Sequence, residues 1–143
     1  MRLATLRTTE GTVAARREGD RWLPIAGAAD VGELLRDPEW RERAARADGE
    51  PVPADTAGLA PVVPHPGKIL CCGLNYASHI GEMGRELPEH PTLFAKFAQT
   101  LTGPEDDVAI PPEDDAIDWE AELVIVVGRG GRRIPRERAA EHI

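Results

Sequence analysis

The 143-residue sequence has only two cysteines, few aromatic residues and no long apolar run. Cys71 and Cys72 are adjacent in a strand-like segment, where neighbouring side chains point to opposite faces, so a disulfide framework is excluded. No apolar stretch approaches the ~20 residues of a membrane span, and residues 1–7 lack the long apolar run of a secretory signal. We therefore expect a soluble, cytoplasmic protein that does not enter a membrane.

Positive charge is also scarce, because 17 Lys and Arg residues face 25 Asp and Glu residues, for a net charge of −8. Generic nucleic-acid binding needs a basic surface that displaces counterions, so nucleic acid is excluded as a partner. Glycine (14) and proline (13) are abundant, which indicates a loop-rich chain and argues against a long helical bundle. Small molecules and cations are the expected ligands.

The N-terminal part of the sequence combines short strands with two helices. Residues 1–25 predict two or three strands with turns at Glu10-Gly11 and at residues 18–20. One or two helical turns are expected over residues 31–36. A second helix is expected from Asp37-Pro38, which supplies an N-cap and a first-turn proline, to about residue 47.

A change of composition marks the expected boundary between two domains. Residues 48–66 are rich in Pro, Gly, Ala and Asp and predict a connector. We therefore predict an N-terminal domain over residues 1–63 and a second domain over residues 64–143.

The second domain is expected to contain strands and short helices. Strands are predicted over residues 68–72 and 92–97, with a helix between them that begins after Asn75 as N-cap and ends at Gly84. The β-branched run 123–127 predicts a strand buried on both faces, and residues 134–143 predict a helix. Such a strand needs neighbours on both edges, and this chain offers few, so we expect another subunit or further chain to complete the core.

Glu120 and Glu122 stand at the start of this apolar run. On a strand, residues two apart point to one face, with their Cβ atoms about 7 Å apart. Two carboxylates at that distance suit a hard cation such as Mg²⁺ or Mn²⁺. The alternative is a pair of solvent-facing glutamates, since exposed Glu is common.

His79 and Glu82 are three residues apart on the helix predicted after Asn75, so their side chains are neighbours on its surface. A carboxylate can hold an imidazole in one tautomer and raise its basicity, as activation of a water molecule requires. The alternative is an exposed helix pair that contributes a few tenths of a kcal/mol, which is about what surface ion pairs contribute.

Several motifs, in this order, resemble the fumarylacetoacetate hydrolase family over residues 64–143. They are Pro66-Gly67-Lys68-Ile69, Gly73-Leu74-Asn75-Tyr76-x-x-His79-x-x-Glu82, Leu93-Phe94-x-Lys96, Gly103-Pro104, Ile110-Pro111 and Asp118-Trp119-Glu120-Ala121-Glu122-Leu123. The resemblance implies an α+β, β-rich fold. A small N-terminal domain of strand meander and helices is followed by the start of a mixed β-roll, incomplete at the C-terminus.

The resemblance also implies a site. Glu120 and Glu122 match metal ligands for Mg²⁺ or Mn²⁺, with Ca²⁺ as a third option. His79 and Glu82 match a pair that activates water for attack on a carbonyl, and Lys96 matches a lysine near the site. The family's third ligand, an Asp further along the chain, has no counterpart up to Ile143.

The implied activity is that of a metal-dependent hydrolase or lyase acting on carbon–carbon bonds of 2-oxo or 1,3-diketo acids, of the acylpyruvate or fumarylpyruvate hydrolase type. Oxaloacetate decarboxylation and hydratase or isomerase steps of aromatic catabolism are alternatives. A further alternative is a catalytically incomplete chain that serves as a non-enzymatic module for cation binding or pairing. The expected partners are the small acid substrate and, when the chain is complete, a second copy in a homodimer.

Overall fold

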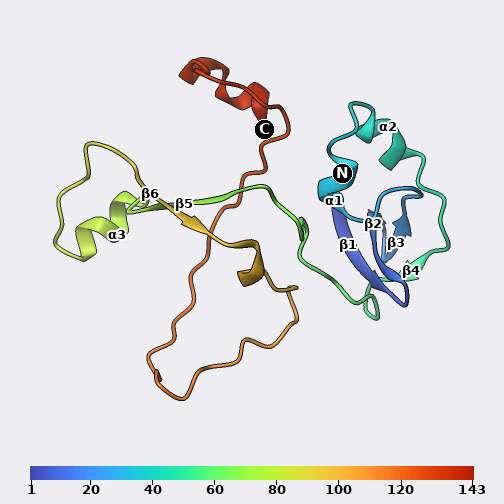
Figure 1. Cartoon of the computed structure of the whole chain (residues 1–143), viewed down its shortest axis with the longest axis horizontal. Helices are drawn as coiled ribbons and strands as arrows, with labels where there is room; N and C mark the ends of the chain where they lie inside the picture. The colour runs from blue at the N-terminus through green and yellow to red at the C-terminus, as the bar shows by residue number, and fades with distance from the viewer.

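The computed structural model describes all residues, 1–143. Its N-terminal part is a four-stranded antiparallel sheet in the order β1-β2-β3-β4 (Figure 1). The strands are β1 (Leu3–Thr8), β2 (Gly11–Glu18), β3 (Arg21–Pro24) and β4 (Val52–Pro53). Residues 1–63, which contain this sheet, are called the N-terminal module below.

Two glycines make the turns of this meander. Gly11, which pairs with Thr8 at the end of the β1–β2 hairpin, has φ +138°. Gly19, between β2 and β3, has φ +58°. Residues with a Cβ rarely adopt these φ values, so glycine is required at both positions. The turns predicted at Glu10-Gly11 and at residues 18–20 are confirmed.

The sheet is buried on both faces because adjacent residues of β2 face opposite sides. Ala14 belongs to a core cluster with Ile25 and Leu34, whereas Ala15 belongs to a second cluster with Trp22. Both alanines are fully buried. Their small side chains let helices approach one face of the sheet and a returning loop approach the other. The module therefore has two small hydrophobic cores, one on each face.

Two short helices cover the first of these faces. Helix α1 (Val31–Leu34) begins at Asp30, whose Oδ1 accepts a hydrogen bond from the Glu33 backbone N–H at 2.8 Å. Helix α2 (Trp40–Ala45) begins two residues later than predicted. Asp37 is not its N-cap, although Asp37 Oδ1 accepts the Glu39 N–H at 2.8 Å in the preceding turn.

Arg43 of α2 has a different partner from the one that helix spacing predicts. The i,i+4 rule pairs it with Glu39, but its Nη1 lies 2.8 Å from Asp37 Oδ2. Arg43 Nη2 also donates to the Ala26 and Gly27 carbonyls at 2.8 and 3.1 Å. Because α2 begins after Asp37, this carboxylate lies beside the helix and accepts from Arg43 Nη1. The two carbonyls accept from Nη2 of the same guanidinium group.

The prediction of a connector over residues 48–66 is wrong for most of that segment, which runs along the free edge of β1 and packs Ala57 into the second core cluster. Beyond β4, the Ala60 N–H donates to the Thr5 carbonyl at 2.9 Å, and Thr5 Oγ1 donates to the Val62 carbonyl at 2.7 Å. Ala57 and Ala60 are buried. Alanines that look like linker composition in the sequence are therefore core residues of the N-terminal module.

The later part of the chain contains a two-stranded antiparallel ribbon, β5 (Ile69–Gly73) and β6 (Thr92–Lys96), as predicted. Between these strands lies helix α3 (Ala77–Glu82), whose N-cap is Tyr76 rather than the predicted Asn75. Gly84, with φ +65°, follows the helix end, where a glycine was expected. A short 3₁₀ turn (Ala98–Thr100) follows β6.

The strand predicted over residues 123–127 is not formed. Leu123 and Val124 are 79% and 80% exposed, and no backbone N–H from residue 120 to residue 127 donates to another part of the chain. β-branched residues favour an extended backbone, but a strand also needs a partner edge, and none lies beside this segment. The expected burial on both faces therefore fails here.

The chain ends in a 3₁₀ helix, Arg136–His142, where an α-helix was predicted. It folds back on the preceding turn, since the Gly128 N–H donates to the His142 carbonyl at 2.9 Å. Trp40 of α2, Val126 and Ile143 help to line a shallow hollow of about 230 Å³. None of the helices combines the length and the apolar character that crossing a membrane requires.

Candidate active site

Helix α3 brings His79 and Glu82 together. His79 Nδ1 lies 3.6 Å from Glu82 Oε2, and the two side chains are 64% and 76% exposed. This separation is an ion-pair distance rather than a hydrogen bond. Ile80, next to His79, is 2% exposed and anchors the helix. The pair predicted from its spacing is therefore present, with both groups open to a ligand from solvent.

Lys96 is the last residue of β6, where it pairs with Ile69 of β5. It is exposed and forms no ion pair with any carboxylate of the chain. An unpaired ammonium on a paired strand can bind a carboxylate ligand without first losing a partner.

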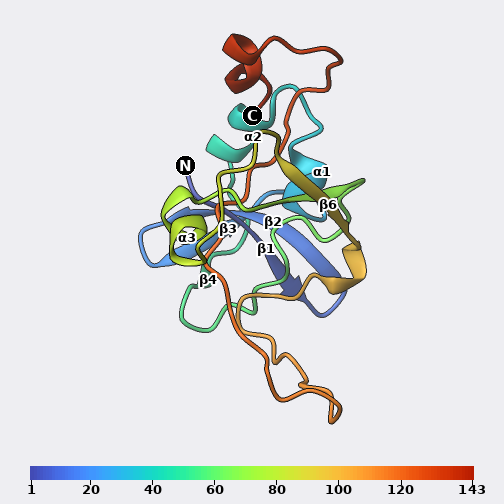
Figure 2. The same ribbon diagram turned by 90° about the vertical axis from the view of Figure 1, so that its left-hand side faces the viewer.

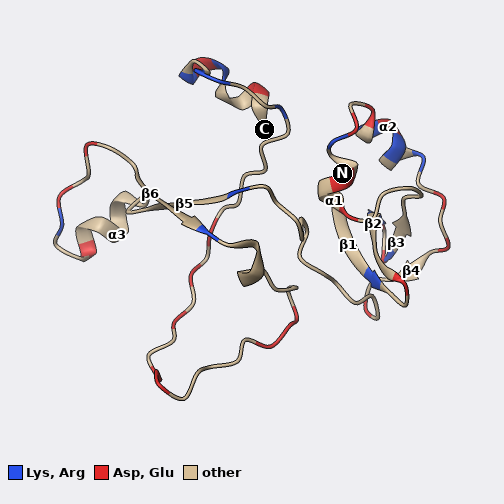
Figure 3. Ribbon diagram, viewed as in Figure 1, with Lys and Arg blue, Asp and Glu red and all other residues tan.

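Glu120 and Glu122 lie in a segment without helix or strand, and both are exposed. The surrounding residues 103–122 contain nine Asp or Glu residues and no Lys or Arg. This stretch runs away from the N-terminal sheet as a long loop, with its carboxylates spread along it (Figures 2 and 3). No hydrogen bond or ion pair joins Glu120 or Glu122 to His79, Glu82 or Lys96.

The structure brings no three His, Cys, Asp or Glu side chains together as a metal site. Glu120 and Glu122 nevertheless provide two carboxylates, and Mg²⁺ is often bound by one or two carboxylates while it retains several waters. The donor chemistry of these two residues therefore fits a hard divalent cation, with the remaining positions left to water or substrate.

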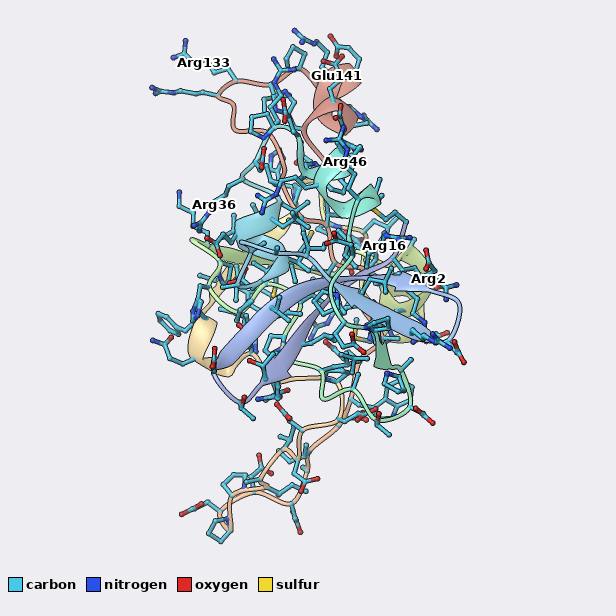
Figure 4. All side chains as sticks on the ribbon, turned by 90° about the vertical axis from the view of Figure 1, so that its right-hand side faces the viewer. Arg2, Arg16, Arg36, Arg46, Arg133 and Glu141 are labelled. Carbon is cyan, nitrogen blue, oxygen red and sulfur yellow. The ribbon has the colours of Figure 1, made fainter.

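A basic cluster lies at the other end of this segment. Arg138 donates to Glu141 at 2.9 Å and lowers the pKa of that carboxyl, with a smaller contribution from the charge of Arg129. Arg133, with φ +53°, extends outward from the C-terminal part of the chain (Figure 4). This group of arginines, Arg129, Arg132, Arg133, Arg136 and Arg138, is therefore mostly a solvated turn with one internal ion pair.

Sequence reasoning missed a contact between residues 99 positions apart. Arg7 of β1 forms an ion pair with Asp106 in the acidic stretch, with 2.5 Å between Nη2 and Oδ2. The only local signal is the turn-forming pair Gly103-Pro104 before Asp106. Spacing rules cannot find such a pair, because it depends on how two parts of the chain meet.

Curated proteins resemble a little over half of this chain. Mitochondrial oxaloacetate tautomerase FAHD2A of Bos taurus is 42% identical over 85 residues, or 59% of this chain and 27% of that protein. The Xenopus laevis oxaloacetate tautomerase fahd2 is 44% identical over 85 residues, 59% of this chain and 26% of that protein. The chain thus spans about a quarter of the length of these relatives, whose names place them in mitochondria.

Two solved structures resemble the whole chain. A Mycobacterium smegmatis protein described as an HpcE protein superposes with a TM-score of 0.80 at 35% identity, over 99% of this chain and 51% of that one. A protein of Mycobacterium abscessus superposes with a TM-score of 0.71 at 30% identity, with the same coverage. The mixed, sheet-rich α and β architecture is therefore shared with folds of about twice this length.

The family comparison covers more than half of the chain. The family model described as fumarylacetoacetate (FAA) hydrolase C-terminal matches residues 68–143, which contain all five candidate site residues. Members of this family are enzymes, and their printed names include both hydrolases and tautomerases. The motifs, the matched region and the shared fold agree, and the chain belongs to the fumarylacetoacetate hydrolase family.

Proposed function

We propose that the protein acts as a hydrolase or lyase on a carbon–carbon bond of a small 2-oxo or 1,3-diketo acid. The observation that carries this proposal is the His79–Glu82 pair. Its Nδ1 and Oε2 atoms are 3.6 Å apart, both side chains are exposed, and the helix that bears them lies in the family-matched region. Acylpyruvates such as fumarylpyruvate are the corresponding substrates.

Glu82 gives His79 the partner that a general base needs. A carboxylate beside Nδ1 favours the tautomer with a proton on that nitrogen and stabilises the imidazolium formed when Nε2 takes a second proton. In hydrolysis, Nε2 removes a proton from water, and the hydroxide adds to a carbonyl carbon. The adjacent carbon–carbon bond then breaks, and the carbon that leaves is protonated by the imidazolium, so that one water yields two acids.

The negative charge of the substrate needs compensation in so acidic a chain. Glu120 and Glu122 would hold Mg²⁺ or Mn²⁺, and a cation there supplies positive charge that polarises a carbonyl oxygen. Lys96, which has no carboxylate partner within the chain, would bind the substrate carboxylate by charge-assisted hydrogen bonds. Both features support an anionic substrate despite the net charge of −8.

A second candidate is tautomerisation of oxaloacetate, which the printed names of the curated relatives favour. In that reaction His79 would take a proton from the carbon beside the carbonyl, and a proton would be returned to the oxygen. No carbon–carbon bond breaks and no water is consumed. The same base therefore serves both candidates, and only the fate of the bond distinguishes them.

One set of assays separates these candidates. The chain is incubated with Mn²⁺ and either an acylpyruvate or enol-oxaloacetate, and ultraviolet absorbance of the enol is followed together with release of pyruvate. Acylpyruvate cleavage supports the hydrolase, and loss of the enol without pyruvate supports the tautomerase. Pyruvate from oxaloacetate indicates decarboxylation. Absence of turnover with either substrate would favour the non-catalytic module, which binds a cation or pairs with another chain without catalysis.

The matched variants are His79→Ala and His90→Ala. His90 is exposed in the loop after α3, so its loss tests whether removal of any nearby imidazole lowers the rate. General-base catalysis contributes about 10²–10⁴-fold, and we expect a decrease of that size for His79→Ala alone. Equal rates in the two variants would refute the role given to His79.

We also propose that the protein pairs with a second copy. Support comes from large apolar side chains that the later part of the chain leaves more than 60% exposed, which is unusual for a monomer. They include Leu70, Leu87, Leu93, Phe97, Val108, Ile110, Trp119, Leu123 and Val124. Light scattering coupled to size-exclusion chromatography would show a single species of twice the chain mass if pairing is specific.

A further inference from the structure

Arg7 lies where three separate segments meet. Its Nε donates to the Leu59 carbonyl at 3.1 Å, and its Nη2 lies 2.5 Å from Asp106 Oδ2. The same carboxylate oxygen accepts the Gly103 N–H at 2.7 Å. Strand β1, the segment paired along its edge at Leu59 and the turn of residues 103–106 are thus joined through one guanidinium and one carboxylate.

Gly103 makes this junction sterically tight. It is buried, whereas every neighbour from residue 99 to residue 107 is exposed. A Cβ at this position would overlap the Leu59 carbonyl oxygen and lie 2.9 Å from Arg7 Nη2. The turn therefore sits directly against the N-terminal module, with no space for a side chain between them.

The junction lies between two parts of the candidate site, Lys96 and the acidic stretch. It follows β6, which ends at Lys96, and it begins the acidic stretch that leads to Glu120 and Glu122. Of the nine carboxylates in that stretch, Asp106 alone forms an ion pair. The position of Asp106 is consequently fixed from outside the stretch, by a residue of the N-terminal module.

The geometry points to Arg7 as a positioning residue, through which the N-terminal module holds the turn of residues 103–106 and fixes where the chain leaves β6 and enters the acidic stretch. This role does not depend on which reaction the protein catalyses. It gives the N-terminal module a function in the arrangement of Lys96 and the acidic stretch, rather than only a fold of its own.

The exposure of the pair sets the size of the expected effect. The Arg7 and Asp106 side chains are 48% and 40% exposed, and isolated ion pairs of this kind contribute little. Here two further hydrogen bonds and the contact of Gly103 share the same atoms. We therefore expect that loss of Arg7 increases local opening of the turn by about fivefold or more.

Cleavage by a glutamate-specific protease tests this directly. Glu105 lies inside the turn, whereas Glu113 lies in the free part of the acidic stretch and serves as an internal reference. Because residues 97–128 contain no Lys or Arg, no basic side chain complicates recognition there. The measured quantity is the rate of cleavage after Glu105 divided by the rate after Glu113, followed by mass spectrometry.

We expect Arg7→Ala to raise this ratio by about fivefold or more, and Asp106→Asn to raise it similarly without a change in the sheet. Arg21→Ala is the matched control, because Arg21 is on the same sheet and its nearest carboxylate, Asp20, is 3.7 Å away. A ratio within about twofold of the wild-type value in both Arg7→Ala and Asp106→Asn would overturn the proposal, since that is below the factor expected from 1 kcal/mol.

Two further readouts separate positioning from general destabilisation. Added NaCl screens the ion pair, so it should raise the ratio in the wild type and leave it unchanged in Arg7→Ala. Arg7→Lys keeps the charge and should recover part of the protection. A ratio equally insensitive to salt in both proteins would contradict the role of the ion pair. If the wild type does not bind Mn²⁺, the proposed metal site is refuted, but the cleavage ratio still tests the role of Arg7.

Discussion

Ile80 is the only apolar residue after residue 63 that belongs to the buried core, at 2% exposed. It anchors α3, a helix of six residues that carries His79 and Glu82. A helix of this length has no stability of its own, because isolated helices shorter than about 12 residues are marginal in water. We therefore expect Ile80→Ala to release α3 and separate the pair.

The magnitude follows from the burial. Replacing a buried Ile with Ala costs about 2–5 kcal/mol, and even 2 kcal/mol shifts a local equilibrium by about 30-fold. Hydrogen exchange of the amides of Ile80 and Met83, which donate to the Tyr76 and His79 carbonyls at 3.1 and 3.2 Å, should accelerate by at least that factor. Turnover that depends on His79 should fall in the same variant.

Met83→Ala is the control for this prediction. Met83 follows the last residue of α3 and is 41% exposed, so its truncation removes side-chain atoms from the same region with little loss of burial. We expect exchange in Met83→Ala to stay within about threefold of the wild type, in line with the ±0.5 kcal/mol typical of surface substitutions. Unchanged exchange in Ile80→Ala would refute the idea that one buried side chain holds the candidate site in place.

Three other predictions concern metal binding, stability and pH. Glu120→Gln should weaken Mn²⁺ binding at least about tenfold in calorimetry, because it removes a charged ligand, and Glu113→Gln should not. Leu34→Ala should lower the free energy of unfolding of the N-terminal module by about 2–5 kcal/mol in urea titrations followed by tryptophan fluorescence, since Leu34 is fully buried. The hydrogen bond from Arg43 lowers the pKa of Asp37 below its usual 3.8, so its stabilisation is complete above that pH and disappears as pH falls through the lowered value. Asp37→Asn should therefore reduce stability at pH 7, and it should remove the loss of stability that the wild type shows below about pH 3.8. Urea midpoints of both proteins, measured at pH 7 and below about pH 3.8, test this.

Much of the fold could be predicted because the signals are local. Glycine at two turns determines the β1–β2–β3 meander, and the alternation of residues 92–96 indicates a strand. The extended preference of residues 123–127 is equally local, but a strand exists only beside another strand. Pairing is a property of two segments, so the sequence of one segment overstates its burial.

The candidate site shows the same division. The spacing of His79 and Glu82 on one helix predicts their approach, and the structure places them 3.6 Å apart. Glu120 and Glu122 are equally evident as a motif, yet their relation to α3 depends on a long loop without regular structure. For the contact of Arg7 with Asp106, the sequence indicates only a turn at Gly103-Pro104 and not the partner, because residues 99 positions apart meet only through the tertiary fold.

The exposed run of residues 123–127 has consequences for how the protein behaves in solution. Carboxylates precede it, at Glu120 and Glu122, and arginines follow it, at Arg129 and Arg132. Two copies aligned in parallel along this run would place like charges opposite each other, whereas an antiparallel alignment would place carboxylates opposite guanidinium groups. The flanking charges thus disfavour one strand orientation, the in-register parallel stacking from which fibrils grow. Their repulsion weakens as salt is added.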